Sequence, residues 1–409
     1  MKYIVLLGDG MADYPSQKLG EKTPLECAFT PFLDQIAGQG TLGLVDTVPE
    51  GYTPGSDVAN LSVLGYDPKE TYTGRGPLEA ASMGINLNPD DIAYRCNLVT
   101  IGSQDTDEAF MDDFTAGHIT SVEAREIIQH INKSIGSSQV QFFPGVGYRH
   151  LMVWRNATGS PQTTPPHDIP GKAISPYLPS GDFSAEVQEI MRKAAEVLKD
   201  HPVNIRRLEN GKKQANSIWL WGQGKKPQIV PLTQKYDLAG GMISAIDLLN
   251  GLGVNAGLKP LRVEGATGYI DTNYEGKAKM ALDALKFMDF VFLHLEAPDE
   301  MGHEGNAEGK ITAIEFFDEK IVGPIVNNIG KLGDEYRILV LSDHPTPLEL
   351  KTHVGDPSPF AVLSSVKDEN RESGGCFTES AARESGLLVS PGYLLMDKFI
   401  QNWSSLLGK

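Results

Sequence analysis

Three short apolar runs, each followed closely by turn residues and an aspartate, constrain the fold of this chain more than any other feature. The runs are 3–7, 290–295 and 338–341, and the aspartates after them are Asp9, Asp299 and Asp343. A short apolar run bounded by turn residues is typical of a parallel strand that is buried on both faces. Because open α/β sheets bind ligands at the carboxyl ends of their strands, we expect the three aspartates at one edge of one sheet.

Histidines accompany two of these aspartates. His344 directly follows Asp343, His353 comes nine residues after His344, and His303 lies four residues after Asp299. Carboxylates and imidazoles together are ligands for divalent cations, although this spacing is not that of a zinc finger. A single histidine is more often a structural residue than a ligand, so the repetition of the pattern carries the metal hypothesis.

Ser56 is a candidate nucleophile. A turn-rich loop at 51–55 runs into a predicted helix that begins near Ser56. A helix N-terminus favours an anion such as a phosphoryl group, but serine there is also a common N-cap, and the cap is the better interpretation of this feature alone. Two cations beside the hydroxyl would instead make it a nucleophile for transfer through phosphoserine. Ser342 is the competitor, but strand alternation turns it away from the face of Asp343.

Residues from about 86 to 230 differ in pattern from the rest of the chain and predict an inserted α+β domain. They contain no strand followed by an aspartate, but they include a predicted strand at 95–100 and a proline-rich loop at 161–181. We therefore expect the insertion at 86–230, between the two halves of an α/β core at 1–85 and 231–409.

Charge and cysteine content exclude several classes of protein. The 409 residues carry a formal net charge of −17, whereas a surface for nucleic acid or for an anionic membrane would be basic. Cys27, Cys96 and Cys376 are few and far apart, which fits a reducing cytoplasm rather than a disulfide scaffold. No apolar stretch approaches a membrane span. We expect a soluble, cytoplasmic protein in which an anionic substrate is bound by local cations.

Seven motifs follow one another along the chain, namely Gly8-Asp9-Gly10, Gly55-Ser56-Asp57, Thr73-Gly74-Arg75-Gly76-Pro77, Arg95-Cys96-Asn97 and the stretches 299–306, 343–347 and 353–357. This series resembles the alkaline phosphatase superfamily and, within it, the cofactor-independent phosphoglycerate mutases of the archaeal type. The resemblance covers nearly the whole chain. It implies an alkaline-phosphatase-like α/β core, in which helices sandwich a mostly parallel sheet, and an inserted α+β cap domain that closes over the site.

The resemblance also implies a two-metal site. One metal would be held by Asp9, Ser56, Asp343 and His344, and the other by Asp299, His303 and His353. Ser56 would be the phosphorylated nucleophile. The ligand types suit Mn²⁺ best, with Mg²⁺, Co²⁺ or Zn²⁺ as alternatives. No bisphosphoglycerate would be needed.

On the substrate side, the resemblance implies basic residues around a small phosphorylated molecule. The candidates are Arg75, Arg95, Arg149, His150, His167, Asp168 and Lys235. Arginine suits such a role through its bidentate fork, although a structural arginine is the commoner case. Lys235 resembles the family's lysine near the transferring phosphate. The chain departs from the family at Met111-Asp112-Asp113-Phe114 and Trp219-Leu220-Trp221-Gly222, where arginines are expected.

Two activities remain open at this point. The first is a 2,3-bisphosphoglycerate-independent phosphoglycerate mutase, which interconverts 3-phosphoglycerate and 2-phosphoglycerate through phosphoserine. The alternative is a homoserine kinase-like phosphotransferase of the same superfamily, with ATP as donor in threonine biosynthesis, which the chain resembles at 166–168 and 219–222. The chain has no P-loop motif for ATP. A metal-binding protein without turnover would not need the activated serine. The oligomeric state is not predicted.

Overall fold

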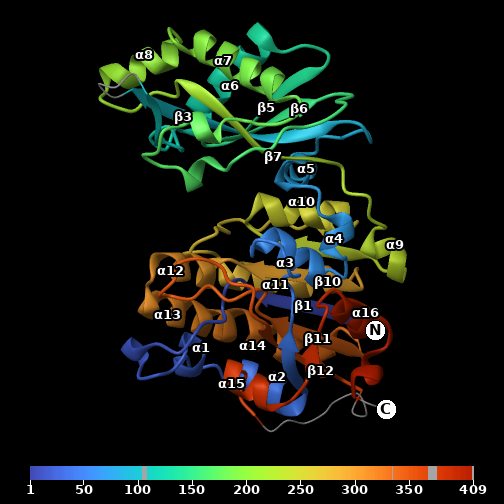
Figure 1. The fold of residues 1–409 in the computed structure, drawn as a ribbon. Coiled ribbons are helices and arrows are strands. Elements are labelled where there is room, and N and C mark those ends of the chain that lie inside the picture. The colour runs from blue at the N-terminus through green and yellow to red at the C-terminus, as the bar shows by residue number, and fades with distance from the viewer. Residues whose placement is uncertain (104–107, 334, 367–374, 408–409) are drawn as a thin grey trace. The chain divides into compact units, whose positions relative to one another are not determined.

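The computed structural model describes residues 1–103, 108–333, 335–366 and 375–407 (Figure 1). The chain forms two compact units: unit 1 consists of Met1–Tyr72 and Gln228–Lys409, and unit 2 is Thr73–Pro227. The expected boundaries at 85/86 and 230/231 therefore lie at 72/73 and 227/228. The first boundary was placed too late because helix α5 (Arg75–Ser82) packs on strands of unit 2.

Unit 1 is built on an eight-stranded sheet with the strand order β13-β2-β12-β11-β1-β10-β8-β9. Its strands are β1 (Lys2–Gly8), β2 (Thr41–Val45), β8 (Gly240–Ile243), β9 (Lys259–Pro260), β10 (Phe290–Leu295), β11 (Tyr336–Leu341), β12 (Ser358–Ser364) and β13 (Leu388–Val389). Neighbouring strands are parallel except where β12 pairs with β11 and β2. The mostly parallel sheet expected for the core is present.

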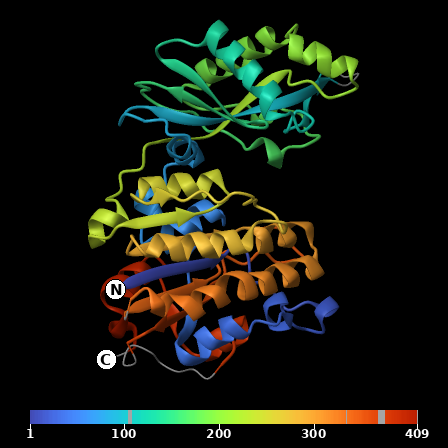
Figure 2. The ribbon, with the colours of Figure 1, turned by 180° about the vertical axis from the view of Figure 1, so that it is seen from behind.

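Helices cover both faces of this sheet (Figures 1 and 2). The helices of unit 1 are α1 (Pro24–Cys27), α2 (Pro31–Gln39), α3 (Ser56–Val63), α4 (Pro68–Thr71), α9 (Leu232–Tyr236), α10 (Asp247–Asn255), α11 (Tyr274–Leu285), α12 (Ala297–Glu304), α13 (Ala307–Phe317), α14 (Gly323–Asn328), α15 (Glu379–Glu384) and α16 (Leu394–Gln401). Ile4 of β1 packs with Phe317 of α13 on one face, whereas Tyr3 contacts Phe399 of α16 on the other. Burial on both faces explains the continuous apolar runs.

Unit 2 has the expected α+β character. Its antiparallel strands are β3 (Ile92–Ser103), β4 (Ala109–Asp113), β5 (Val140–Val146), β6 (Arg149–Trp154) and β7 (Ser217–Lys225), in the order β4-β3-β6-β5 with β7 paired to β3. Its other helices are α6 (Ser121–Ile135), α7 (Ser184–Leu198) and α8 (Pro202–Glu209). Ile127 of α6 and Val187 of α7 pack in one core with Leu98 of β3. Among the described helices of both units, none combines the length and apolar composition needed to cross a bilayer.

Candidate active site

The register of the unit 1 sheet brings the carboxyl ends of β1, β10 and β11 to one edge. Gly8, at the end of β1, pairs with Leu295, at the end of β10, and β11 runs parallel on the other side of β1. Asp9 follows β1, Asp343 follows β11, and Asp299 lies in the first turn of α12, just after β10. The structure therefore brings the three aspartates together from segments that are far apart in the sequence.

One set of candidate ligands surrounds Asp299. Because residues four apart lie on the same face of a helix, α12 points Asp299 and His303 in one direction, with His303 Nε2 3.2 Å from Asp299 Oδ2. His353 Nε2 lies 3.4 Å from Asp299 Oδ1 and 2.9 Å from His303 Nε2. Ligands at about 2.1 Å from a tetrahedral ion lie about 3.4 Å from one another. The spacing of these three side chains therefore fits a single cation.

A second set surrounds the Nε2 atom of His344. Ser56 Oγ lies 3.3 Å from this nitrogen, and Asp9 Oδ1 and Asp343 Oδ2 both lie 3.5 Å from it. Asp9, Asp343 and His344 are fully buried, and Asp9 Oδ1 has no hydrogen-bond partner among the described residues. A buried carboxylate oxygen without a partner is costly. A cation held by these residues would remove that cost.

Hydrogen bonds place a proton on the Nδ1 atom of two of the histidine rings. His303 Nδ1 lies 3.0 Å from the carbonyl of Lys351, which can only accept, so Nδ1 carries a proton. Thr346 Oγ1 donates its proton to Asp299 Oδ1 and therefore accepts from His344 Nδ1 at 3.3 Å. In the neutral rings, both Nε2 lone pairs then face the candidate ligand sets. Outer partners of this kind are typical of histidines that bind metals.

The pKa values of the acidic residues at this edge reflect their burial and their closeness to one another. Burial and then the charge of Asp343 raise the pKa of Asp9 well above its usual value. Burial and the charge of Asp299 raise the pKa of Glu296 to about 8. Burial also opposes ionisation of Asp299, but hydrogen bonds with His303 hold its pKa well below the usual range. Bound cations favour the ionised form of such crowded carboxylates.

Gly10 allows the loop after β1 to approach α12 closely. Its φ is +58°, and a Cβ atom there would overlap the side chains of Asp299 and Thr346 and lie 2.8 Å from Asp299 Cα. The Gly10 N–H donates to Asp343 Oδ1 at 3.2 Å. Glycine supplies both the left-handed conformation and the space.

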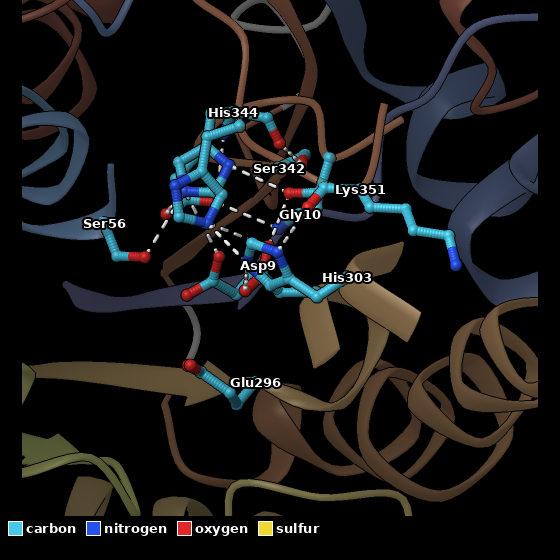
Figure 3. Close-up of polar contacts among 12 residues, drawn as sticks. Asp9, Gly10, Ser56, Glu296, His303, Ser342, His344 and Lys351 are labelled. Carbon is cyan, nitrogen blue, oxygen red and sulfur yellow. Dashed lines mark hydrogen bonds and ion pairs between the residues drawn. The ribbon is translucent and has the colours of Figure 1, made fainter. Parts of the chain in front are cut away.

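Ser56 and Ser342, the two candidate nucleophiles, differ in what their hydroxyls contact. Ser56 is the first residue of α3, and the N-cap is Gly55, so the interpretation of Ser56 as the cap was wrong. Its hydroxyl instead faces His344. Ser342 donates to the carbonyl of His344 and accepts the N–H of Ala12, so its hydroxyl is directed at backbone groups (Figure 3).

The sequence reasoning missed several residues at this edge. Asn60 Nδ2 donates to Asp343 Oδ2 at 2.8 Å, and its position four residues after Ser56, on the same helix face, was an available signal. Glu296 and His294 flank the end of β10, and His294 Nε2 lies 2.8 Å from Asp9 Oδ2. A histidine inside an otherwise apolar strand was the signal for that contact.

In unit 2, three of the predicted substrate ligands act on one another. The guanidinium of Arg95 lies 4.4 Å above the ring of Trp221, and its Nε is 2.9 Å from Glu79 Oε1. Burial lowers the pKa of Arg95, and the positive charges of Arg75 and Arg149 lower it further. The charge of Glu79 acts in the opposite direction on this pKa. Guanidinium groups that lie this close together are suited to binding an anion.

A row of aromatic rings joins this arginine cluster. The ring of His167 lies 5.2 Å from that of Trp221 and 6.2 Å from that of Phe114. Phe114 lies 6.1 Å from Tyr148, which in turn lies under the guanidinium of Arg149 at 5.7 Å. The two stretches in which arginine was expected therefore contribute Phe114 and Trp221, aromatic rings in contact with the predicted ligands.

The remaining predicted residues are placed differently. His150 adjoins Arg149 on β6, so strand alternation turns it to the opposite face, where it is 1% exposed and accepts a backbone N–H of β5. Asp168 has a side chain that is 59% exposed. Lys235 lies in unit 1, on α9, and its Nζ is 2.8 Å from Asp397 Oδ1.

The fold and the ligand sets together define a class: an α/β protein with candidate sites for divalent cations beside a serine hydroxyl at a helix N-terminus. The family model for 2,3-bisphosphoglycerate-independent phosphoglycerate mutase matches residues 37–204. A probable 2,3-bisphosphoglycerate-independent phosphoglycerate mutase of Geobacter sulfurreducens is 54% identical over 98% of this chain and 100% of its own length. The mutase of Methanosarcina barkeri is 50% identical over 95% of this chain and 96% of its own.

Solved structures agree with these relatives. A protein of Pyrococcus horikoshii has a TM-score of 0.82 and 30% identity, and the match covers 98% of this chain and 97% of that one. A cofactor-independent phosphoglycerate mutase of Thermoplasma acidophilum has a TM-score of 0.66 and 28% identity, covering 98% and 99%. This chain belongs to the family of 2,3-bisphosphoglycerate-independent phosphoglycerate mutases.

Proposed function

We propose that this protein is an enzyme that interconverts 3-phosphoglycerate and 2-phosphoglycerate without bisphosphoglycerate. The observation that carries the proposal is the position of Ser56 Oγ, which lies 3.3 Å from His344 Nε2 at the N-terminus of α3. Relatives that are 50–54% identical over nearly the whole chain carry the mutase name and support this substrate over homoserine.

The donor set fits two divalent cations. Asp9, Ser56, Asp343 and His344 would hold one, and Asp299, His303 and His353 the other. When bound, the cations lower the pKa of the serine hydroxyl and neutralise phosphate charge. Carboxylate and imidazole donors suit Mn²⁺ or Mg²⁺ better than a thiolate-seeking ion, and Co²⁺ and Zn²⁺ are the alternatives.

Ser56 would act as the carrier of the phosphoryl group. Its Oγ attacks the phosphorus of 3-phosphoglycerate, and the bond from phosphorus to the C3 oxygen breaks. The C3 oxygen takes up the proton that the Ser56 hydroxyl loses, which gives glycerate. The 2-hydroxyl then attacks phosphoserine, and Ser56 Oγ leaves and recovers a proton. The backbone N–H groups at the start of α3 favour the phosphoryl group at that position. Water must be kept out, because hydrolysis of phosphoserine would turn the mutase into a phosphatase.

The arginines of unit 2 would bind the remaining charge of the substrate. We assign the carboxylate to the cluster of Arg75, Arg95 and Arg149, with His167 beside it, because paired N–H groups match a carboxylate. We do not assign His150 to this carboxylate, because it faces the opposite side of β6 and accepts a backbone N–H there. The contact of Lys235 with the phosphate stays a prediction, since this lysine is paired with Asp397.

An activity assay with two substrate sets tests the proposal. The purified protein with Mn²⁺ should convert 3-phosphoglycerate, and it should not consume ATP with homoserine. Ser56→Ala should lose several orders of magnitude in kcat, because both transfer steps need the same oxygen. The matched control is Ser62→Ala, on the same helix, whose buried hydroxyl has no hydrogen-bond partner among the described residues. Activity retained in Ser56→Ala, or phosphate label on Ser342 or a histidine after rapid quenching, would exclude the mechanism.

A further inference from the structure

Asp9, His294 and Ser244 form a hydrogen-bonded chain across the carboxyl ends of three neighbouring strands. His294 Nε2 lies 2.8 Å from Asp9 Oδ2, and its Nδ1 lies 3.2 Å from Ser244 Oγ. The strands β1, β10 and β8 are adjacent in that order, and the register pairs Leu7 with His294 and Leu293 with Ile243. The register therefore sets Ser244 beside His294, and Asp9 follows two residues after Leu7, the residue paired with His294 on the other side.

The direction of these hydrogen bonds follows from the state of Asp9. A carboxylate that binds a cation is ionised and can only accept, so His294 Nε2 must donate to it. The neutral ring then accepts at Nδ1, and the hydroxyl of Ser244 is the donor there. Ser244 Oγ also accepts the N–H of Ile246 at 3.0 Å, which holds it in place. The trio has the residue types of a hydrolytic triad, but its serine is on the wrong ring nitrogen and its aspartate faces the cation site.

Other charged groups face His294 without replacing this contact. Glu296 Oε2 is 3.4 Å from Nε2, farther than Asp9 Oδ2, and makes no hydrogen bond within the described part of the chain. The ammonium of the buried Lys277 donates to the backbone carbonyl of His294 at 3.1 Å rather than to its ring. His294 is itself fully buried, so its ring has no contact with bulk solvent.

The hydrogen bond from His294 to Asp9 leaves only one carboxylate oxygen of Asp9 for a cation. Oδ2 receives the N–H of His294, whereas Oδ1 has no hydrogen-bond partner in the described residues and lies 3.5 Å from His344 Nε2. We propose that His294, held by Ser244, is a positioning residue that presents Asp9 Oδ1 to the cation site of Asp9, Ser56, Asp343 and His344. The inference rests on the cation assignment of the proposed function. Second partners of this kind change metal affinity by about 10- to 100-fold.

A Mn²⁺ titration of the full chain, following free Mn²⁺ by electron paramagnetic resonance, tests this role without any substrate. The wild type should show two binding events. His294→Leu should weaken one event by about 10- to 100-fold and leave the other within about threefold, because Asp299, His303 and His353 lie outside the hydrogen-bonded chain. His294→Gln should recover most of the loss, since its amide N–H can replace Nε2–H. Ser244→Ala should weaken the same event by a smaller factor.

Tyr94→Phe is the matched control, since it removes a buried hydroxyl of unit 2 that has no partner among the described residues. Circular dichroism in excess chelator checks the fold of each variant. If His294→Leu does not fold, Ser244→Ala carries the test and must weaken one event alone. Three results would overturn the positioning role while the cation assignment stands. Both Mn²⁺ binding events could be weakened equally, both could be unchanged, or His294→Gln could bind as weakly as His294→Leu. A wild type that binds no Mn²⁺ would overturn both.

Discussion

Replacing Trp221 with leucine should weaken substrate binding without slowing the chemical step. The guanidinium of Arg95 lies 4.4 Å from the centre of the Trp221 ring, and Arg95 is 8% exposed. A desolvated cation–π contact contributes about 2 kcal/mol. Without the ring, Arg95 would have to be ordered when the substrate binds, at a cost of at most the energy of this contact. With tenfold for each 1.4 kcal/mol, KM for 3-phosphoglycerate should rise by up to about 30-fold. The kcat should stay within about threefold, because the same contact is present in the ground state and in the transition state.

Initial rates over a range of 3-phosphoglycerate concentrations at saturating Mn²⁺ give both constants. Trp219→Leu is the matched control, since Trp219 lies on the same strand but its indole donates to the carbonyl of Thr164. Trp221→Phe should fall between the wild type and leucine, because a phenyl ring offers a weaker face to the cation. An unchanged KM in Trp221→Leu, an equal rise in Trp219→Leu, or a loss confined to kcat would refute the reasoning.

Two further predictions concern unit 1: the space around Gly10 and the pH dependence of stability at Glu379. Gly10→Ala should remove Mn²⁺ binding and mutase activity, because the added Cβ would displace Asp299. The control is Gly20→Ala, since Gly20 has a similar φ of +67° but nothing within 4 Å of the added Cβ. This control should lose only about 1–2 kcal/mol of stability. Burial raises the pKa of Glu379 from its usual 4.5 to about 7, so the folded state keeps a proton that the unfolded state loses between these values. Wild-type stability therefore falls as pH rises through that window, and Glu379→Gln should be about 3 kcal/mol more stable than wild type at pH 8 but nearly equal at about pH 4, below the window. Urea unfolding in excess chelator measures this difference, and a variant no more stable at pH 8 would contradict it.

The clustering of the candidate cation ligands could be predicted from the sequence because it follows from local patterns. Asp9 and Asp343 each come just after a continuous apolar run, and parallel pairing of such runs brings their carboxyl ends together. Asp299 and His303 are four residues apart, so a single helix directs both to one point. In these cases the secondary structure alone determines where the side chain goes.

Other features depend on tertiary pairing, which no local pattern reports. The contact between Arg95 and Trp221 exists because β7 pairs with β3 in a register that sets these two residues side by side. The first boundary was misplaced because the pattern of the sequence changes only after α5, and the packing of α5 on β3 and β7 is what assigns this helix to unit 2. His150 is a different case, since alternation along β6 already forbids it from sharing a face with Arg149.

The charges of the two units favour one acceptor over the other. In unit 1, crowded buried carboxylates raise the pKa of Asp9 and so favour cations, which in turn favour a phosphate. In unit 2, the charges of Arg75 and Arg149 act on Arg95, so a carboxylate relieves their repulsion whereas an ammonium group would add to it. Phosphoglycerate carries a phosphate and a carboxylate with no positive charge. Homoserine carries an ammonium group next to its carboxylate, and Glu79, an acid that could offset this charge, is already paired with Arg95 at 2.9 Å. The electrostatics of the arginine cluster thus support glycerate as the acceptor.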